Sequence, residues 1–161
     1  MTTLEYNKAV DKYADALYRF ILKNLRDTEK SKDIIQDTFE KLWMNVQQIA
    51  FEKVKSYLFT VAYHTMIDLI RKDNRISAYN ESLSPELTEL NQYNDLQEVL
   101  DKALSQLPEI QKAVLLLRDY EGYSYEEIGQ ITNLNESQVK VYIYRARIFL
   151  KNYIGSLETV V

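Results

Sequence analysis

Residues 124–151 read SYEEIGQITNLNESQVKVYIYRARIFLK, and this stretch predicts two helices joined by a short polar turn. Ser124 and Glu127 have the form of a capping box, in which a serine and a glutamate three residues later each satisfy a free backbone N–H at a helix start. Asn135 and Gln138 can cap a second helix in the same way. A short helix, a tight turn and a longer helix in this order are typical of a helix-turn-helix.

The longer helix of this pair has two unlike faces at 100° per residue. Its apolar face carries Val139, Ile143, Ala146 and Leu150. Its outward face carries Ser137, Val141, Tyr144 and Arg145. The outward Val141 and Ile148 can touch a thymine methyl group or a partner protein. We interpret residues 155–161 as a short frayed tail.

The same helix has the chemistry of a nucleic-acid-binding element. It carries four cations that can neutralise phosphates, namely Lys140, Arg145, Arg147 and Lys151. In its N-terminal half, Ser137, Gln138 and Tyr142 can reach base edges in a major groove. A solvated amphipathic helix with ordinary surface charge fits the pattern too, so both interpretations stay open.

Composition indicates a globular, helical protein. The chain has 161 residues, of which 46% are hydrophobic and 27% charged, and this balance excludes a disordered or collagen-like chain. Its 3 Gly and 2 Pro are too few for the turns of a sandwich or barrel, whereas good helix formers are abundant. We predict an all-α fold of two small helical domains, since the length suits one ordinary domain or two small ones.

Several kinds of chemistry lack the residues that they need. With no Cys and 1 His, the chain cannot form disulfides, a thiolate nucleophile or a Cys/His zinc site. It has no Gly-rich phosphate loop, so we expect neither an enzyme nor a cofactor. No apolar run reaches the ~18 residues of a membrane span, and residues 1–11 carry no signal pattern, so a cytoplasmic location is expected.

Apolar periodicity predicts three helices in the first half of the chain. The first covers about residues 7–25. The second follows Ser31, a plausible N-cap, and continues to about Ile49. The third begins near Ser56 and ends in the charged run at residues 71–75. These three helices can bury one shared core.

Charge is segregated along the chain, although its net value is only −4. Residues 53–75 hold five basic and two acidic side chains, whereas residues 76–109 hold one basic and seven acidic ones. Screening over ~8 to 10 Å makes such local balances matter more than the total. We predict a first domain at 1–75, an acidic linker at 76–92 and a second domain at 93–161.

The third helix has an unusual face opposite its core stripe. That face combines Thr60, Tyr63, His64, Ile67 and Arg71, with Lys53, Lys55 and Lys72 close to it in sequence. Aromatic rings beside cations are what unstacked single-stranded bases require, although a chance mixture on a structural helix is the alternative. A flipped base could sit between the second and third helices, near residues 47–55.

The second helix has an acidic face. Asp33, Gln36, Asp37 and Glu40 stand at i, i+3, i+4 and i+7, and Trp43 borders them. Neighbouring carboxylates repel one another, so the row suggests a basic partner, although most such rows are simply solvated. A carboxylate metal site is not expected, because the Glu-x-x-His motif of di-iron bundles is absent.

Several stretches resemble one family, the extracytoplasmic-function (group IV) sigma factors of bacterial RNA polymerase. Residues 33–43, DIIQDTFEKLW, resemble the region-two signature of that family. Its next helix resembles residues 56–62 and 68–72, and its region four resembles residues 107–108, 123–128 and 139–147. The resemblance extends over nearly the whole chain, and the order and spacing of the stretches are more specific than any one of them.

The resemblance implies how such a chain would work. The region-two helix would dock on the coiled coil of the polymerase β′ subunit, and the next helix would open and read the minus-ten promoter element. The region-four helix-turn-helix would bind the minus-thirty-five element, and the sigma factor would be released after initiation. Implied partners are core RNA polymerase through its β′ and β subunits, promoter DNA and an anti-sigma protein, which is usually membrane-bound.

The resemblance also implies three sets of site residues. Polymerase contacts would fall on Asp33, Ile34, Ile35, Gln36, Asp37, Phe39, Glu40 and Trp43. Minus-ten contacts would fall on Lys53, Lys55, Thr60, Tyr63, His64, Ile67, Arg71 and Lys72. Minus-thirty-five contacts would fall on Ser124, Tyr125, Asn135, Ser137, Gln138, Lys140, Val141, Tyr142, Tyr144, Arg145 and Arg147.

Two departures from the family pattern concern DNA. Tyr63-His64 stands where the family commonly has Arg-Asn, and Val141-Tyr142 stands where its last helix often has Ser-Arg. Polymerase docking should therefore transfer better than promoter sequence. Two other functions remain as alternatives: a stand-alone helix-turn-helix regulator with a symmetric operator, and a helical protein-binding adaptor or inhibitor that binds no DNA.

Overall fold

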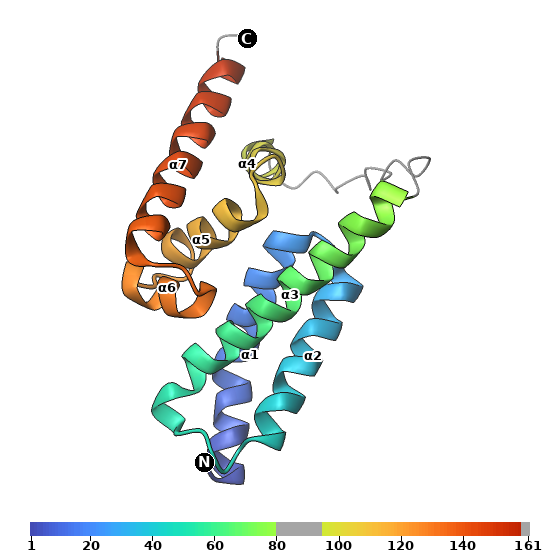
Figure 1. Cartoon of the computed structure of the whole chain (residues 1–161), viewed down its shortest axis with the longest axis vertical. Coiled ribbons are helices and arrows are strands. Elements are labelled where there is room, and N and C mark those ends of the chain that lie inside the picture. The colour runs from blue at the N-terminus through green and yellow to red at the C-terminus, as the bar shows by residue number, and fades with distance from the viewer. Residues whose placement is uncertain (80–94, 159–161) are drawn as a thin grey trace.

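The structure, a computed structural model, describes residues 1–79 and 95–158. These residues contain no strand and form α1 (Thr3–Leu25), α2 (Thr28–Met44), α3 (Val54–Tyr79), α4 (Asp95–Ser105), α5 (Glu109–Asp119), α6 (Tyr125–Thr132) and α7 (Glu136–Glu158) (Figure 1). A 3-10 turn, Phe51–Lys53, precedes α3. The all-α prediction is confirmed, and the predicted linker lies outside the described residues from position 80 onward.

The first group of helices is a three-helix bundle of α1, α2 and α3. Apolar side chains at helical spacing meet in its interior, among them Leu17, Phe20, Ile21, Leu42, Leu58 and Met66. Each helix thus buries one stripe and leaves the rest of its surface to solvent, as amphipathic periodicity predicts. The helix α3 also extends to Tyr79, four residues beyond the charged run that the sequence analysis took as its end.

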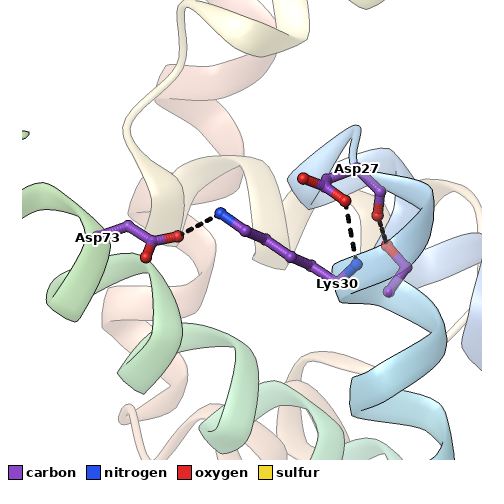
Figure 2. A network of polar contacts seen from close by, with 4 residues as sticks. Asp27, Lys30 and Asp73 are labelled. Atoms are coloured by element: carbon purple, nitrogen blue, oxygen red, sulfur yellow. Dashed lines mark hydrogen bonds and ion pairs between the residues drawn. The ribbon is translucent and has the colours of Figure 1, made fainter. Parts of the chain in front are cut away.

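The start of α2 differs from the expectation. Its N-cap is Asp27 and not Ser31, and the Asp27 carboxylate accepts a hydrogen bond from the Lys30 backbone N–H at 3.0 Å (Figure 2). Ser31 is buried one turn inside the helix, where its hydroxyl donates to the Asp27 carbonyl at 2.6 Å. The same figure shows Lys30 Nζ reaching the Asp73 carboxylate on α3 at 2.7 Å, which ties α2 to α3.

The end of α2 also differs, because the helix stops at Met44 and not near Ile49. The Asn45 side chain donates to the Lys41 carbonyl at 2.9 Å, and its backbone carbonyl accepts from Gln48 N–H at 2.9 Å. These bonds replace the helical ladder with a turn. The resulting connection between α2 and α3 holds residues 45–53.

The second group of helices is built around α5, which packs against α1, α6 and α7. All five residues from Ala113 to Leu117 are buried, so the middle of α5 is enclosed around its whole circumference. The predicted helix-turn-helix of α6 and α7 is present and packs on α5, with Ser124 and Glu127 forming the expected capping box. Asn135 and Gln138 exchange the expected pair of hydrogen bonds, at 3.0 and 2.8 Å.

The turn between α6 and α7 depends on close backbone approach. Asn133 ends α6 in the left-handed conformation, with φ of 62°, and the chain then folds back over Gly129. A Cβ atom at Gly129 would lie 2.7 Å from the Leu134 carbonyl oxygen. The helix α7 then continues to Glu158, so its residues 155–158 are helical and not a frayed tail.

The two groups touch along α3 and α1: α3 packs on α6, and α1 packs on α5. The ring of Phe59 meets the ring of Tyr123 edge-on at 5.3 Å between centroids, and Lys55 Nζ lies 4.5 Å from the centre of the Tyr123 ring. Burial raises the pKa of the Tyr123 phenol. The second group therefore covers part of α3.

Polar contacts cross the same interface. The Arg19 guanidinium donates to both carboxylate oxygens of Glu121, at 3.1 and 2.9 Å. The Glu121 side chain is 5% exposed and that of Arg19 49%. Nearby, Lys112 Nζ donates to the Asn24 carbonyl at 2.7 Å, and burial lowers the pKa of Lys112, with a further contribution from the Arg26 cation. These contacts satisfy charged groups that the packing removes from water.

Replacing Gly129 by Ala is expected to lower the free energy of unfolding by about 1 to 3 kcal/mol, because the added methyl group would clash with the Leu134 carbonyl. Gly155→Ala is the matched control, since no heavy atom lies within 4 Å of its added Cβ. The control should be unchanged or slightly more stable, because Ala is the better helix former. Urea unfolding followed by circular dichroism measures both; equal midpoints for the two variants would contradict the steric argument.

Replacing Arg19 by Ala is expected to loosen the packing of the two groups by about 1 to 2 kcal/mol, because it leaves a buried Glu121 carboxylate unpaired. The chain has no Cys, so a thiol introduced by Ile67→Cys in the covered part of α3 reports on opening. Its labelling rate should rise about 5- to 30-fold in the Arg19→Ala background.

Lys30→Ala is the control for this experiment, because the Lys30–Asp73 pair lies within the first group and is exposed at both ends. It should leave the labelling rate of the introduced thiol unchanged. A rate that Arg19→Ala does not raise above that of the Lys30→Ala variant would mean that the ion pair does not hold the groups together.

Candidate nucleic-acid and partner interfaces

The acidic face predicted on α2 is a surface feature. Asp33, Gln36 and Glu40 are exposed. Asp37 is half-buried, and its carboxylate pairs with Lys41 Nζ at 3.0 Å, which offsets part of the repulsion along the row. The face thus offers carboxylates and an amide to a basic or hydrogen-bonding partner.

Aromatic side chains border this face. Trp43 is half-exposed and meets the Tyr6 ring edge-on at 5.0 Å between centroids. The Tyr6 hydroxyl donates to the Phe39 carbonyl at 3.2 Å, so α1 holds the end of α2 in place. An aromatic ring fixed beside carboxylates is suited to a protein partner, because aromatic anchors carry much of the binding energy at interfaces.

Three residues of the predicted polymerase set lie inward. Ile34 and Phe39 are buried in the bundle core, and Ile35 is half-buried against it. Ile34 and Phe39 therefore cannot contact a partner in this arrangement. Their role here is to fix the rotation of α2, which sets the direction of the acidic face.

The predicted outward face of α3 is partly wrong. Tyr63 and Ile67 are each 4% exposed, because they belong to the core. Ile67 also lines a pocket together with Pro108 and Ile110 of the second group and Tyr142 of α7. No local sequence pattern predicts this contact, since its partners are about 40 to 75 positions away from Ile67.

The rest of the predicted minus-ten set remains accessible. Thr60 is half-buried, and His64, Arg71, Lys72, Lys53 and Lys55 are exposed. His64 rests edge-on against the Tyr63 ring, at 5.2 Å between centroids. This side of the bundle thus presents mostly cationic groups, with the apolar and aromatic members of the set underneath.

A groove lies at the place where a flipped base was expected. It has a volume of about 530 Å³ and is lined by Gln48, Ile49, Ala50, Glu52, Lys53, Ser56, Tyr57, Thr60 and Gln130. All of these except Gln130 belong to the α2–α3 connection and the start of α3. Gln130 comes from α6 and was missed, because no sequence pattern links it to residues 48–60.

The outward face of α7 is as predicted. Ser137, Gln138, Lys140, Val141, Tyr144 and Arg145 are all exposed. Lys140 Nζ lies 3.5 Å from Glu136 in an exposed pair, which leaves its cation accessible. The first turns of α7 therefore combine hydrogen-bonding, cationic and apolar side chains on one open surface.

Other members of the minus-thirty-five set have structural roles. Arg147 donates to both oxygens of Asp119 at 2.6 and 3.3 Å, so it ties α7 to the end of α5. Tyr142 is half-buried and lines the pocket that Ile67 shares. Ser124 and Asn135 serve as helix caps, with Asn135 itself exposed.

A further cation, outside the predicted site residues, lies beside the helix-turn-helix. The Arg118 guanidinium lies 4.6 Å from the centre of the Tyr125 ring, and it donates to the Tyr123 carbonyl at 2.8 Å. Lys140 Nζ lies 5.5 Å from the same Tyr125 ring. In the sequence, the only indication of this cation's role is its place as the basic residue in the last turn of α5.

Two negative findings concern residues 1–79 and 95–158. No group of three His, Asp or Glu side chains there could hold a metal ion. None of the helices described there is long and apolar enough to cross a membrane.

Comparison with protein-family models identifies both halves of the chain. The model described as Sigma-70 region 2 matches residues 9–76. The model described as Sigma-70, region 4 matches residues 97–150. The two matches coincide with the bundle of α1–α3 and with most of α4–α7.

Individual relatives extend over most of the chain. The ECF RNA polymerase sigma factor SigM of Bacillus subtilis is 29% identical over 144 residues, covering 86% of this chain and 88% of SigM. The ferric citrate uptake sigma factor FecI of Escherichia coli is 30% identical over 139 residues, covering 81% of this chain and 79% of FecI.

Solved structures agree with these matches. The sigma factor RpoE of Bartonella quintana, crystallised with the anti-sigma factor NepR, superposes with a TM-score of 0.80 and 25% identity, covering 93% of this chain and 96% of RpoE. Since the region 2 model, the region 4 model and relatives matched over most of their length agree, the chain belongs to the sigma-70 family, as a sigma factor of the extracytoplasmic-function (ECF) group.

Proposed function

We propose that this sigma factor divides its work between a region-two domain at 1–75 and a region-four domain at 93–161, joined by the linker at 76–92. The first binds core RNA polymerase and helps to melt the minus-ten element, and the second anchors upstream duplex DNA. The match of separate family models to residues 9–76 and 97–150 carries this proposal. After initiation, the sigma factor is released from the polymerase.

The polymerase contact is proposed to lie on the acidic face of α2. The exposed Asp33, Gln36 and Glu40 and the half-exposed Trp43 support this, since they can be reached without any rearrangement. Asp37 would exchange its pairing with Lys41 for a basic group of the β′ subunit. Ile34, Ile35 and Phe39 act from beneath by holding α2 in register.

The minus-ten contact is proposed to use the groove at the α2–α3 connection and the cations beside it. A groove of about 530 Å³ has room for a nucleobase, and Tyr57 and Lys53 in its lining suit a base and a phosphate. Lys55, Thr60, His64, Arg71 and Lys72 would follow the strand along α3. Ile67, which shares a pocket with region-four side chains, would join them only after that domain moves away, and the buried Tyr63 only after a local rearrangement.

The minus-thirty-five contact is proposed for the helix-turn-helix. The outward side chains of α7 would enter the major groove, with base-edge contacts from Ser137 and Gln138 and phosphate contacts from Lys140 and Arg145. Tyr125 and Asn135 lie at the starts of α6 and α7, where free backbone N–H groups favour phosphate. Arg147 would support α7 through Asp119.

The proposed function also includes a regulatory partner and a cellular location. An anti-sigma protein is a proposed partner, because the similar RpoE was crystallised with one. The proposed site of action is the cytoplasm, where core polymerase and promoter DNA are found. The chain itself would make and break no covalent bond, in keeping with a family that is not enzymatic.

Run-off transcription with core RNA polymerase and fragmented genomic DNA of the source organism tests the function. Wild type should yield discrete transcripts, and Gln36→Ala combined with Asp37→Ala should reduce them at least tenfold, because it removes an amide and a carboxylate from the α2 face. Asn7→Ala with Asp11→Ala is the matched control, since it removes the same two groups from an exposed part of α1.

Other outcomes would support other functions. If wild type yields no specific transcript and does not co-purify with active core polymerase, the sigma proposal fails. Tight promoter binding without polymerase would then favour a stand-alone regulator, and the absence of salt-dependent DNA binding would favour a protein-binding adaptor.

A further inference from the structure

The outward face of α7 carries an apolar row that the phosphate and base-edge contacts do not explain. Val141 and Ile148 are 44% and 40% exposed, and Tyr144 lies between them and is more exposed still. Their spacing of three and four residues places them on one side of the helix. A helix whose outer face served only solvation would carry polar side chains at these positions.

Val141 and Ile148 differ in their distance from the start of α7. Val141 is the sixth residue of α7, about 8 Å from its start at 1.5 Å per residue, whereas Ile148 is about 18 Å from it. In a helix-turn-helix, the N-terminal residues of the second helix contact base edges. Of the two aliphatic side chains, Val141 therefore lies where bases are read.

The surroundings of Val141 favour DNA over an apolar protein surface. Exposed Gln138, Lys140 and Arg145 surround it. Within residues 136–156 of α7 the charged side chains are four cations and the single acid Glu136. Val141 is the one exposed aliphatic residue among residues 136–143, and such a basic surface complements a polyanion whose groove contains isolated methyl groups.

We propose that Val141 reads the 5-methyl group of a thymine in the major groove of the upstream promoter element. Thymine alone among the four bases presents a methyl group there, and valine has no hydrogen-bonding group with which to read any other edge. The proposal rests on the proposed function of the helix-turn-helix and adds to it the identity of one recognised base.

The test removes one methyl group at a time. The probe is the strongest promoter fragment recovered by run-off transcription, in which each thymine of the protected upstream element is replaced singly by deoxyuridine. This change deletes the 5-methyl group and keeps all base pairing. Wild-type holoenzyme should lose about fourfold in affinity at one thymine, the factor equivalent to one buried methyl group.

Variants assign the effect to a residue. Val141→Ser holoenzyme should bind the thymine and deoxyuridine probes equally at that position, and Val141→Ile should retain the difference. Ile148→Ser is the matched control, because it removes a similarly exposed aliphatic group farther along the same row and should keep the wild-type profile. Both positions are exposed, so neither change should unfold the domain.

Two results would overturn the inference. A Val141→Ser holoenzyme with the wild-type deoxyuridine profile would show that Val141 does not read the methyl group. The apolar row would then be assigned to contact with a partner protein. A wild-type holoenzyme that protects upstream DNA but is insensitive to every deoxyuridine would do the same. Protection of no upstream DNA would instead remove the proposed function of the helix-turn-helix.

Discussion

The packing of α6 and the Tyr123 loop against α3 is the contact on which the rest of the arrangement depends. It sets Phe59 against Tyr123, and the adjoining contact with α1 removes Glu121 and Lys112 from water. Burying such charges is unfavourable unless each is paired, and Arg19 and the Asn24 carbonyl supply the partners. Apolar packing accompanies these polar contacts, because the buried side chains of both helix groups form one continuous cluster.

This arrangement leaves some of the proposed contact surfaces exposed and buries parts of another. The acidic face of α2 and the outward face of α7 are exposed, whereas Tyr63 and Ile67 of α3 are buried. The groove at the α2–α3 connection is only partly enclosed by the second group of helices, which contributes Gln130 of α6 to its wall. The proposed polymerase contact on α2 and the proposed duplex contact on α7 are therefore accessible in this arrangement, whereas the proposed single-strand contact at Ile67 requires the second group of helices to move away from α3.

Local features were predictable wherever neighbours in sequence decide them. The capping pairs Ser124–Glu127 and Asn135–Gln138 form as expected, since each satisfies backbone groups within three residues. The prediction for Ser31 was wrong because Asp27, one turn earlier, also fits an N-cap, and burial of Ser31 decided between them. Helical periodicity alone does not show which of two suitable residues is the N-cap of a helix.

By itself, the sequence determined the all-α class, the helix-turn-helix, the buried stripes and the outward face of α7, because helix propensity, capping and 3.6-residue periodicity act over short separations. Only the tertiary structure decided which second surface each helix buries. Ile67 has the same local pattern whether α3 faces water or another group of helices, and the side chains beside it in the shared pocket lie far along the chain. Contacts between distant residues depend on the folded path of the whole chain, which no local pattern encodes.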